Sequence, residues 1–294
     1  MRFEGVIPAA MTPFTAGDEI DVEALAANVA WMRDAHCTGF VACGTMGEAS
    51  TLSAAERRLV IETAVAASDA PVTAGVSAGT PRDAIGYAID AAAAGAQSLM
   101  LLPPVGYTAD DRELIAFYRA VAAATSLPIM AYNNPVASGG TDMAPELIVR
   151  LAAEVEDVVA IKECSGDARR IAALLDLSPD LEVLVGGDDW ALEGFCAGAA
   201  GWITGVGVVL PAPSVRLWDL CAAGDLAAAR RVYAELLPLC RLDMTPKLVQ
   251  YFKAALDELG LAGGPCRPPR MALTDDELAI LRDAVANATS AAVS

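Results

Sequence analysis

The chain has 294 residues, of which 55% are hydrophobic, and it carries a formal net charge of −18. A chain of this length and apolar content can fill one large α/β barrel, and its composition excludes an intrinsically disordered protein. The negative field repels phosphate backbones and anionic lipid surfaces, so we expect neither nucleic acid nor a membrane as a partner.

Short aliphatic runs alternate with longer Ala-rich amphipathic segments, which is typical of parallel βα units. Eight such units can be counted, and their near-regular spacing favours a closed (β/α)8 TIM barrel over an open doubly wound sheet. The predicted strands are residues 5–10, 39–43, 71–76, 98–102, 128–132, 158–162, 181–186 and 201–205. The predicted helices are residues 21–35, 53–67, 81–94, 110–124, 145–153, 167–175, 189–197 and 213–223.

Two of the predicted helices begin with recognisable caps. Ser53 and Glu56 form a capping-box pattern, in which the hydroxyl accepts from a free N–H group and the carboxylate reaches back to the cap residue. Thr80 stands before Pro81, and a proline at the first helical position needs no hydrogen-bond acceptor. These patterns predict where the second and third helices begin.

Three further helices are predicted after the eighth unit, at 225–238, 244–259 and 274–288. A barrel does not need them, so they could cover one of its faces, contact another subunit, or do both. No linker in the chain is long enough to separate independent domains. We therefore predict a barrel at 1–224 and, at 225–294, a C-terminal helical extension of the same domain.

Metal and nucleotide sites lack their usual patterns in this sequence. The seven cysteines include no CxxC pair and His36 is the single histidine, so neither a zinc site nor a disulfide framework is expected. No P-loop motif is present, and the segment 205–207 lacks the strand–turn–helix context of a dinucleotide site. Scattered cysteines and the absence of a long uncharged apolar run predict a cytoplasmic protein that uses no cofactor and no metal.

Lysine is rare in this chain, because Lys162, Lys247 and Lys253 stand against seventeen arginines. Lys162 ends an apolar run at the C-terminal edge of the sixth predicted strand, where barrel enzymes place their catalytic groups. Because burial disfavours the charged ammonium, we expect the pKa of Lys162 to fall and its free amine to act as a nucleophile. A lysine whose tip extends out of the barrel mouth would fit the same position.

Two more candidate groups lie at the ends of other predicted strands. Tyr132 ends the fifth strand, so its phenol is expected beside Lys162, where it could transfer protons; a tyrosine that packs its ring in the core would also fit. The second strand ends in the turn 43–48, whose N–H groups could bind a carboxylate beside the hydroxyl of Thr45. A tight βα connection would need the same glycines.

Glycines also follow the seventh and eighth predicted strands, at 186–187 and 205–207. They keep bulk away from the barrel mouth, or they serve as turns and caps. Asp188 and Asp189, which come directly after the first pair, are interpreted as helix caps rather than as acid catalysts.

Three segments together resemble the dihydrodipicolinate synthase and N-acetylneuraminate lyase family: GTMGE at 44–48, YNNP at 132–135 and IKE at 161–163. They occur in the family's order and spacing, and the resemblance covers nearly the whole chain. It implies a barrel enzyme that holds a small 2-oxo acid as an iminium and uses this iminium as an electron sink. It also implies a homotetramer, as in typical members.

The resemblance assigns roles to particular residues. Lys162 matches the lysine that forms the Schiff base, Tyr132 matches the tyrosine that transfers protons, and Thr45 matches the hydroxyl that orients this tyrosine. The substrate-binding positions that it implies, by backbone amides or by lining the pocket, are Thr45, Met46, Gly187 and Ile203.

Two departures distinguish the chain from typical dihydrodipicolinate synthases. Such synthases carry a second threonine where Met46 stands, and an arginine shortly after the YNxP motif, where residues 136–139 read VASG. Both are missing, which disfavours that activity. Tyr107 lies near the family's relay tyrosine, but it does not align cleanly enough to receive a role.

The segments 242–251 and 267–270 resemble a bacterial subgroup in hydroxyproline degradation, the 1-pyrroline-4-hydroxy-2-carboxylate deaminases, which form 2,5-dioxopentanoate and ammonia. A shared helical extension would explain this likeness equally. The alternative enzymes are a 2-keto-3-deoxy sugar acid dehydratase or aldolase and a 4-hydroxy-tetrahydrodipicolinate synthase. An alternative of another class is a barrel that binds a small molecule without turnover, although Lys162, Tyr132 and Thr45 together argue against it.

Overall fold

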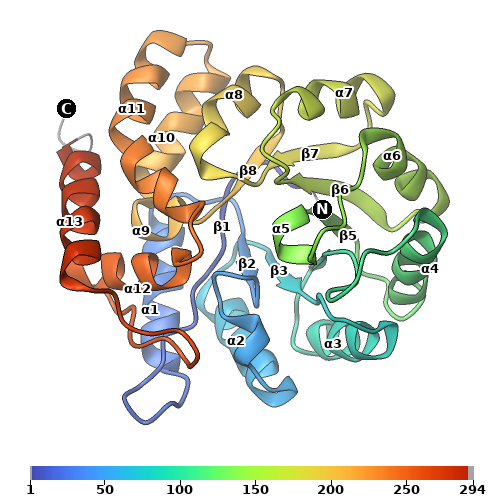
Figure 1. Cartoon of the computed structure of the whole chain (residues 1–294), viewed down its shortest axis with the longest axis horizontal. Helices are drawn as coiled ribbons and strands as arrows, with labels where there is room; N and C mark the ends of the chain where they lie inside the picture. Colours follow the sequence, from blue (N-terminus) through green and yellow to red (C-terminus); the bar gives the residue numbers. More distant parts are fainter. Residues whose placement is uncertain (1, 291–294) are drawn as a thin grey trace.

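The computed structural model describes residues 2–290 of the chain (Figure 1). Its strands are β1 (Gly5–Pro8), β2 (Phe40–Ala42), β3 (Val72–Gly75), β4 (Ser98–Leu101), β5 (Ile129–Asn133), β6 (Val158–Glu163), β7 (Glu182–Val185) and β8 (Gly201–Thr204). They pair in parallel in the order β1-β8-β7-β6-β5-β4-β3-β2. A parallel bridge between Ala9 and Val41 closes the sheet. The predicted (β/α)8 barrel is confirmed.

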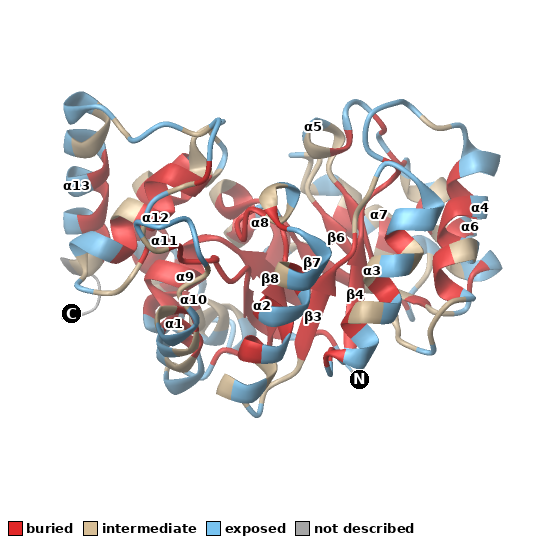
Figure 2. Cartoon of the chain, turned by 90° about the horizontal axis from the view of Figure 1, so that it is seen from below, coloured by how far each residue is buried: buried red, intermediate tan, exposed pale blue. Residues whose placement is uncertain are grey.

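The strands are buried, which explains their continuous apolar sequences. Every residue of β4, β5 and β8 is buried. Figure 2 shows buried residues in the strands and on the inner faces of the surrounding helices, with exposed residues outside. Tyr132 and Lys162 are direct register partners near the C-terminal ends of β5 and β6. Their side chains are therefore delivered to the same end of the barrel.

A helix follows each strand close to its predicted place, and both predicted caps are confirmed. Ser53 and Glu56 form the capping box of the second helix, and Thr80 caps the helix that begins with Pro81. These helices are α1 (Val22–Asp34), α2 (Ala54–Ala67), α3 (Pro81–Ala93), α4 (Asp111–Ala122), α6 (Pro145–Glu154), α7 (Arg169–Leu177), α8 (Ala191–Cys196) and α10 (Pro211–Ala222).

Four short helical segments follow the C-terminal ends of strands; three of them were not predicted, and the fourth, at 188–190, overlaps the start of the predicted helix 189–197. They are the 3-10 helices η1 (Ala49–Thr51) and η2 (Asp188–Trp190), and the single turns α5 (Pro135–Ser138) and α9 (Val206–Val209). Segments of three or four residues are too short to show helical periodicity in a sequence. They shape the connections at the barrel mouth.

The C-terminal extension consists of α11 (Leu226–Asp243), α12 (Leu248–Glu258) and α13 (Asp275–Ser290), which lie on one side of the barrel (Figure 1). The prediction ended its first helix at Pro238, but α11 continues to Asp243. A proline removes one helical hydrogen bond. The fully buried side chains of Leu236 and Leu239 flank it and hold the helix in register. The last residues of the predicted extension, 291–294, lie outside the described residues.

None of the helices within residues 2–290 combines the length and the apolar character needed to cross a bilayer. In the same part of the chain, no three His, Cys, Asp or Glu side chains are grouped as metal ligands. The seven cysteines are free thiols.

Candidate active site

Lys162 and Tyr132 lie side by side at the barrel mouth. The Lys162 Nζ lies 4.2 Å from the centre of the Tyr132 ring. The exposed fractions of the two residues are 8% and 4%, so the lysine does not extend into solvent. A buried amine beside a phenol can attack a carbonyl or imine carbon once the amine is deprotonated.

The Tyr132 hydroxyl has a hydrogen-bond partner that the sequence analysis did not identify. Asn134 donates from Nδ2 to this hydroxyl over 2.8 Å. The Oδ1 of Asn134 accepts from the N–H of Ala137 and so caps α5, which fixes the amide in place. Burial raises the pKa of Tyr132 to about 12, with Lys162 acting in the opposite direction. The phenol therefore keeps its proton at neutral pH.

The pKa of Lys162 differs from the expectation. Burial lowers it, as predicted, but coupling to the acidic groups Tyr132, Cys164 and Asp243 acts in the opposite direction, and the pKa of Lys162 lies above its ordinary value. The prediction of a lowered pKa is therefore wrong. The sequence showed the apolar strand around the amine, but not the acidic groups that the fold brings beside it.

The turn after β2 lines the same cavity as Lys162. It begins at Cys43 and ends at Glu48, which have left-handed backbone conformations with φ of 56° and 54°. Such strain persists where the surrounding fold holds a loop in one shape. Within residues 2–290, the N–H groups of Thr45 and Met46 donate to no protein acceptor. Two adjacent N–H groups of this kind can bind a carboxylate.

One cavity of about 390 Å³ joins these groups. Its wall includes Lys162, Tyr132, Thr45, Met46 and Ile203, so the structure brings together five of the six predicted site residues. Among the described residues, Lys162 is the one basic side chain on this wall.

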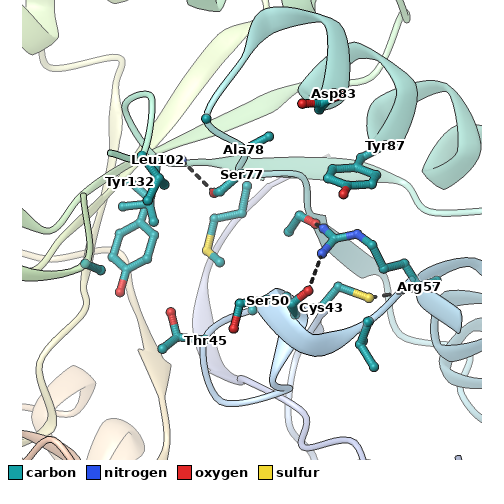
Figure 3. Close-up of a pocket in the computed structure, with 18 of the residues that line it drawn as sticks. Cys43, Thr45, Ser50, Arg57, Ser77, Ala78, Asp83, Tyr87, Leu102 and Tyr132 are labelled. Atoms are coloured by element: carbon teal, nitrogen blue, oxygen red, sulfur yellow. Dashed lines mark hydrogen bonds between the residues drawn. The ribbon is translucent and has the colours of Figure 1, made fainter. Parts of the chain in front are cut away.

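A neighbouring cavity of about 460 Å³ shares Thr45 and Tyr132 with the first (Figure 3). Arg57 lies on its other side, where its Nη1 donates to the carbonyl oxygen of Ala49 over 3.0 Å. The guanidinium carbon lies 4.1 Å from the centre of the Tyr87 ring. Arg57 thereby fastens η1, and with it the turn that carries Thr45, to α2.

The sixth predicted residue, Gly187, does not line this cavity, whereas its neighbour Gly186 does. A β-carbon at Gly186 would lie 2.8 Å from Lys162 Cε and 2.8 Å from the carbonyl oxygen of Glu163. Gly187 instead packs against the indole of Trp190 and is not among the cavity residues. The position beside the Lys162 side chain therefore requires a glycine at 186.

We expect Gly186→Ala to lower kcat/KM by roughly 100-fold, because the added methyl group displaces the Lys162 side chain from its reacting position. Steady-state assays of the purified variant measure this loss. Gly86→Ala is the matched control, since a β-carbon at Gly86 meets nothing within 4 Å. Wild-type kinetics in Gly186→Ala would show that Lys162 tolerates displacement and is not held for reaction.

Asp188 caps a helix other than the one that it begins. Its fully buried carboxylate accepts hydrogen bonds from Trp202 Nε1 over 2.8 Å and from the N–H groups of Gly205 and Val206 over 3.1 and 2.7 Å. The interpretation as a cap of the helix after β7 is therefore wrong, because the Asp188 carboxylate binds N–H groups at the start of α9 instead. This bond set fixes the chain where β8 ends at the cavity.

Asp243, the last residue of α11, also lies on the cavity wall and was not selected from the sequence. It follows an ordinary amphipathic helix, so no local pattern distinguishes it from a surface aspartate. Its place depends on how the C-terminal extension docks on the barrel, which is a property of the tertiary fold.

The same extension supports the turn of Thr45 from behind. Glu48 is fully buried, and its Oε1 lies 2.6 Å from the Nζ of Lys253 on α12. Its Oε2 accepts from the N–H of Arg267 over 3.1 Å and lies 3.3 Å from Nη1 of Arg270. The turn is thus connected to α12 and to the segment that precedes α13.

Comparison with known proteins identifies the family of the chain. The model of the dihydrodipicolinate synthetase family matches residues 2–288. The 4-hydroxy-tetrahydrodipicolinate synthase of Methanothrix thermoacetophila is 35% identical over 286 residues, which cover 96% of this chain and 95% of that protein. The enzyme of the same name from Methanosarcina mazei is 36% identical over 278 residues, 93% of this chain and 94% of that protein.

Solved structures give the same result for the fold. The 4-hydroxy-tetrahydrodipicolinate synthase of Methylacidiphilum fumariolicum SolV superposes with a TM-score of 0.95 at 27% identity, covering 99% of this chain and 98% of that one. The dihydrodipicolinate synthase of Aquifex aeolicus superposes with a TM-score of 0.92 at 28% identity, covering 98% of both chains. The chain belongs to the dihydrodipicolinate synthetase family, whose members are lyases that form a Schiff base with a lysine.

Proposed function

We propose that Lys162 forms the Schiff base with a small 2-oxo acid or a cyclic imino acid. The observation that carries this proposal is the shared cavity, in which the Lys162 amine lies 4.2 Å from the Tyr132 ring and the N–H groups of Thr45 and Met46 are available for a carboxylate. The amides bind the substrate carboxylate, the amine attacks C2, and the phenol of Tyr132 carries protons. Thr45 lies on the same wall, where it can orient the phenol or the substrate.

The specific reaction that we propose is the deamination of 1-pyrroline-4-hydroxy-2-carboxylate. Two features of the cavity support it over condensation with a second anionic substrate. Met46 presents an apolar side chain where a typical synthase has a hydroxyl, and Ala137 stands on the wall in the region where a synthase has an arginine. The cavity therefore offers few groups for a second carboxylate.

Every step of the proposed deamination uses the lysine, the phenol or water. Lys162 Nζ bonds to C2, the C2–N1 bond breaks, and the ring nitrogen leaves as a primary amine on C5. Loss of a C3 proton, assisted by Tyr132, and of the C4 hydroxyl as water is followed by a proton shift that places an imine at C5. One water hydrolyses this imine to ammonia and an aldehyde, and a second releases 2,5-dioxopentanoate from Lys162.

The second candidate is 4-hydroxy-tetrahydrodipicolinate synthase, and the names of the relatives favour it. Relatives at 35% and 36% identity over most of the chain carry this name. It shares the Schiff base with the deaminase and differs in what reacts with the iminium afterwards. The two activities therefore cannot be separated by trapping alone.

Product analysis separates the two candidates. In the first reaction, the purified enzyme is supplied with 1-pyrroline-4-hydroxy-2-carboxylate and the release of ammonia is measured. In a second reaction, the enzyme is supplied with pyruvate and the other substrate of the synthase, and 4-hydroxy-tetrahydrodipicolinate is measured by mass spectrometry. We expect ammonia and 2,5-dioxopentanoate in the first reaction and little product in the second. The reverse result would replace the deaminase by the synthase. A pyruvate adduct with neither product would redirect the search to 2-keto-3-deoxy sugar acids.

Tyr132→Phe is expected to lower kcat by roughly 100- to 10,000-fold, because the variant loses the proton-transferring hydroxyl and keeps the ring beside Lys162. Tyr251→Phe is the control, since Tyr251 lies on α12 and lines neither of the two cavities. Pre-steady-state measurements should still detect a slow Schiff base in Tyr132→Phe. Unchanged turnover would remove Tyr132 from the mechanism.

Assembly belongs to the same proposal. We propose that the chain is one domain that forms a homotetramer in the cytoplasm. Val105, Tyr107 and Val136 support an interface near the site, since their exposed fractions are 41%, 49% and 93%. Tyr107 lines neither cavity, so its exposed ring has no role within the isolated chain. An interface between subunits would bury this ring. Light scattering of the purified protein measures the subunit number.

A further inference from the structure

Asp243 brings a carboxylate onto the cavity wall from outside the barrel. It ends α11 and is partly buried, and the wall that it shares with Lys162 also contains Met46 and Gly205. A β-carbon at Gly205 would overlap Asp243 Oδ1 and would lie 3.2 Å from Met46 Cε. The missing side chain at Gly205 therefore makes room for the carboxylate, in the part of the wall formed by β8 and Met46.

The charge of this carboxylate acts on the site. Burial raises the pKa of Asp243 to about 6, Lys162 lowers it, and Asp189 raises it further. Asp243 in turn raises the pKa of Lys162. At neutral pH and above, the cavity therefore contains a carboxylate, and Lys162 is the one basic group among the described residues of its wall.

The consequence for a bound 2-oxo acid follows from Coulomb's law. The substrate carboxylate is placed at the Thr45 and Met46 amides and C2 at Lys162, so the rest of the chain extends into the remaining cavity, which Asp243 borders. A second carboxylate there is repelled by Asp243 and finds no other cation among the described wall residues. An ammonium group there is attracted by Asp243, and a hydroxyl group there can donate a hydrogen bond to it.

We propose that Asp243 determines which charge the site accepts at the far end of the substrate, so that it selects 2-oxo acids or imino acids whose distal group is cationic or donates hydrogen bonds, and rejects those with a second carboxylate. This inference rests on the proposed Schiff base at Lys162 but not on the identity of the final product.

The charge selection agrees with the first step of the proposed deamination. When Lys162 Nζ bonds to C2 and the C2–N1 bond breaks, the ring nitrogen takes up a proton and becomes an ammonium group on C5. Asp243 neutralises this new charge inside a cavity of low polarity. Reclosure of the ring is thereby disfavoured, because the amine must lose that proton before it can attack C2 again.

Three probes of equal chain length test the selection. They are 2-oxopentanoate, whose far end is neutral; 2-oxoglutarate, whose far end is a carboxylate; and 1-pyrroline-2-carboxylate, which opens on the enzyme to a chain that ends in an ammonium group. None has a hydroxyl to eliminate, so each stops at the Schiff base. The half-saturating concentration for the borohydride-reduced adduct is measured for each probe by intact-mass spectrometry.

At pH 8, the ratio of half-saturating concentrations for the anionic and cationic probes is expected to fall at least about tenfold in Asp243→Asn, with the neutral probe changed less than about threefold. Asp176→Asn is the matched control, since it removes the same charge from an exposed position on α7 outside the cavity. An unchanged ratio in Asp243→Asn overturns the proposal.

The wild-type enzyme provides an independent test, which also decides the question if Asp243→Asn fails to fold. The same ratio should shrink as the pH falls through about 6, because Asp243 becomes neutral, whereas slower amine attack affects all probes alike. The other titratable groups whose fields couple to Asp243 are Lys162, Cys164, Asp188, Asp189 and Cys240. Asp189→Asn should lower the midpoint, since its repulsion raises the pKa of Asp243.

The outcomes separate this inference from the proposed function. Adducts with all three probes at similar concentrations would keep the Schiff base and overturn the role of Asp243. A ratio that stays constant between pH 8 and pH 5 would do the same. No adduct with any probe would overturn both.

Discussion

Replacing Lys162 with alanine is expected to lower kcat/KM by at least about 10⁴-fold. The variant loses the nucleophile, and with it the covalent intermediate that splits the reaction into accessible steps. No second amine can substitute among the described residues, because Lys162 is the one basic side chain on the cavity wall. Ammonia release from 1-pyrroline-4-hydroxy-2-carboxylate, followed over hours at high enzyme concentration, measures the residual rate.

Lys247→Ala is the matched control for this loss. Lys247 lies near the cavity, but its side chain is 41% exposed and pairs with Glu277 on α13. The control should keep at least about half of the wild-type rate, since an exposed pair contributes little. Equal losses in the two variants would contradict a specific role for Lys162. Circular dichroism of both variants shows whether the fold is retained.

The second large effect is expected on stability. Lys253→Met should lower the free energy of unfolding by about 3–5 kcal/mol, because it leaves the buried Glu48 carboxylate without its closest cation. The Lys253 Nζ lies 2.6 Å from Glu48 Oε1 and donates to the carbonyl oxygen of Pro265 over 2.8 Å. Both side chains are almost fully buried, with exposed fractions of 2% and 0%. Urea unfolding at one protein concentration measures the change.

Two further variants test the cause of this effect. Lys247→Met removes a lysine from the exposed pair with Glu277 and should cost about 0–1 kcal/mol. The double variant Glu48→Gln, Lys253→Met removes both buried charges and should cost less than the sum of the two single variants. A Lys253→Met variant no less stable than Lys247→Met would show that the buried pair contributes little.

Much of the barrel could be predicted because its parts are local in sequence. Alternating aliphatic runs and amphipathic segments mark the strands and helices, and the caps at Ser53 and Thr80 fix two helix starts. The helix through Pro238 was cut short because a proline normally ends a helix, whereas here the buried residues beside it keep the helix intact. The single turns α5 and α9 are too short to have a period.

The candidate site divides in the same way. Tyr132 and Lys162 could be placed together because adjacent strands of a parallel barrel bring their C-terminal ends together. Asn134 was missed within a motif that had been selected, and of the glycine pair expected at the barrel mouth Gly187 was chosen for the wall where Gly186 lies, since a sequence does not show which residue faces the cavity.

Asp243 and the raised pKa of Lys162 could not be predicted from local sequence. Both depend on the docking of α11, which places the carboxylate at the barrel mouth far from Lys162 in sequence. An apolar strand around a lysine predicts a lowered pKa only when no acidic group from elsewhere in the fold approaches it.

Peptide mapping of the borohydride-reduced pyruvate adduct tests the central claim most directly. The chain has three lysines, so proteolysis and mass spectrometry can assign the adduct to one of them. Our account predicts one pyruvate-derived modification, on the peptide that contains Lys162, and none after Lys162→Ala. A modification on the peptide of Lys247 or Lys253, or no modification under conditions that reduce a Schiff base, would contradict it.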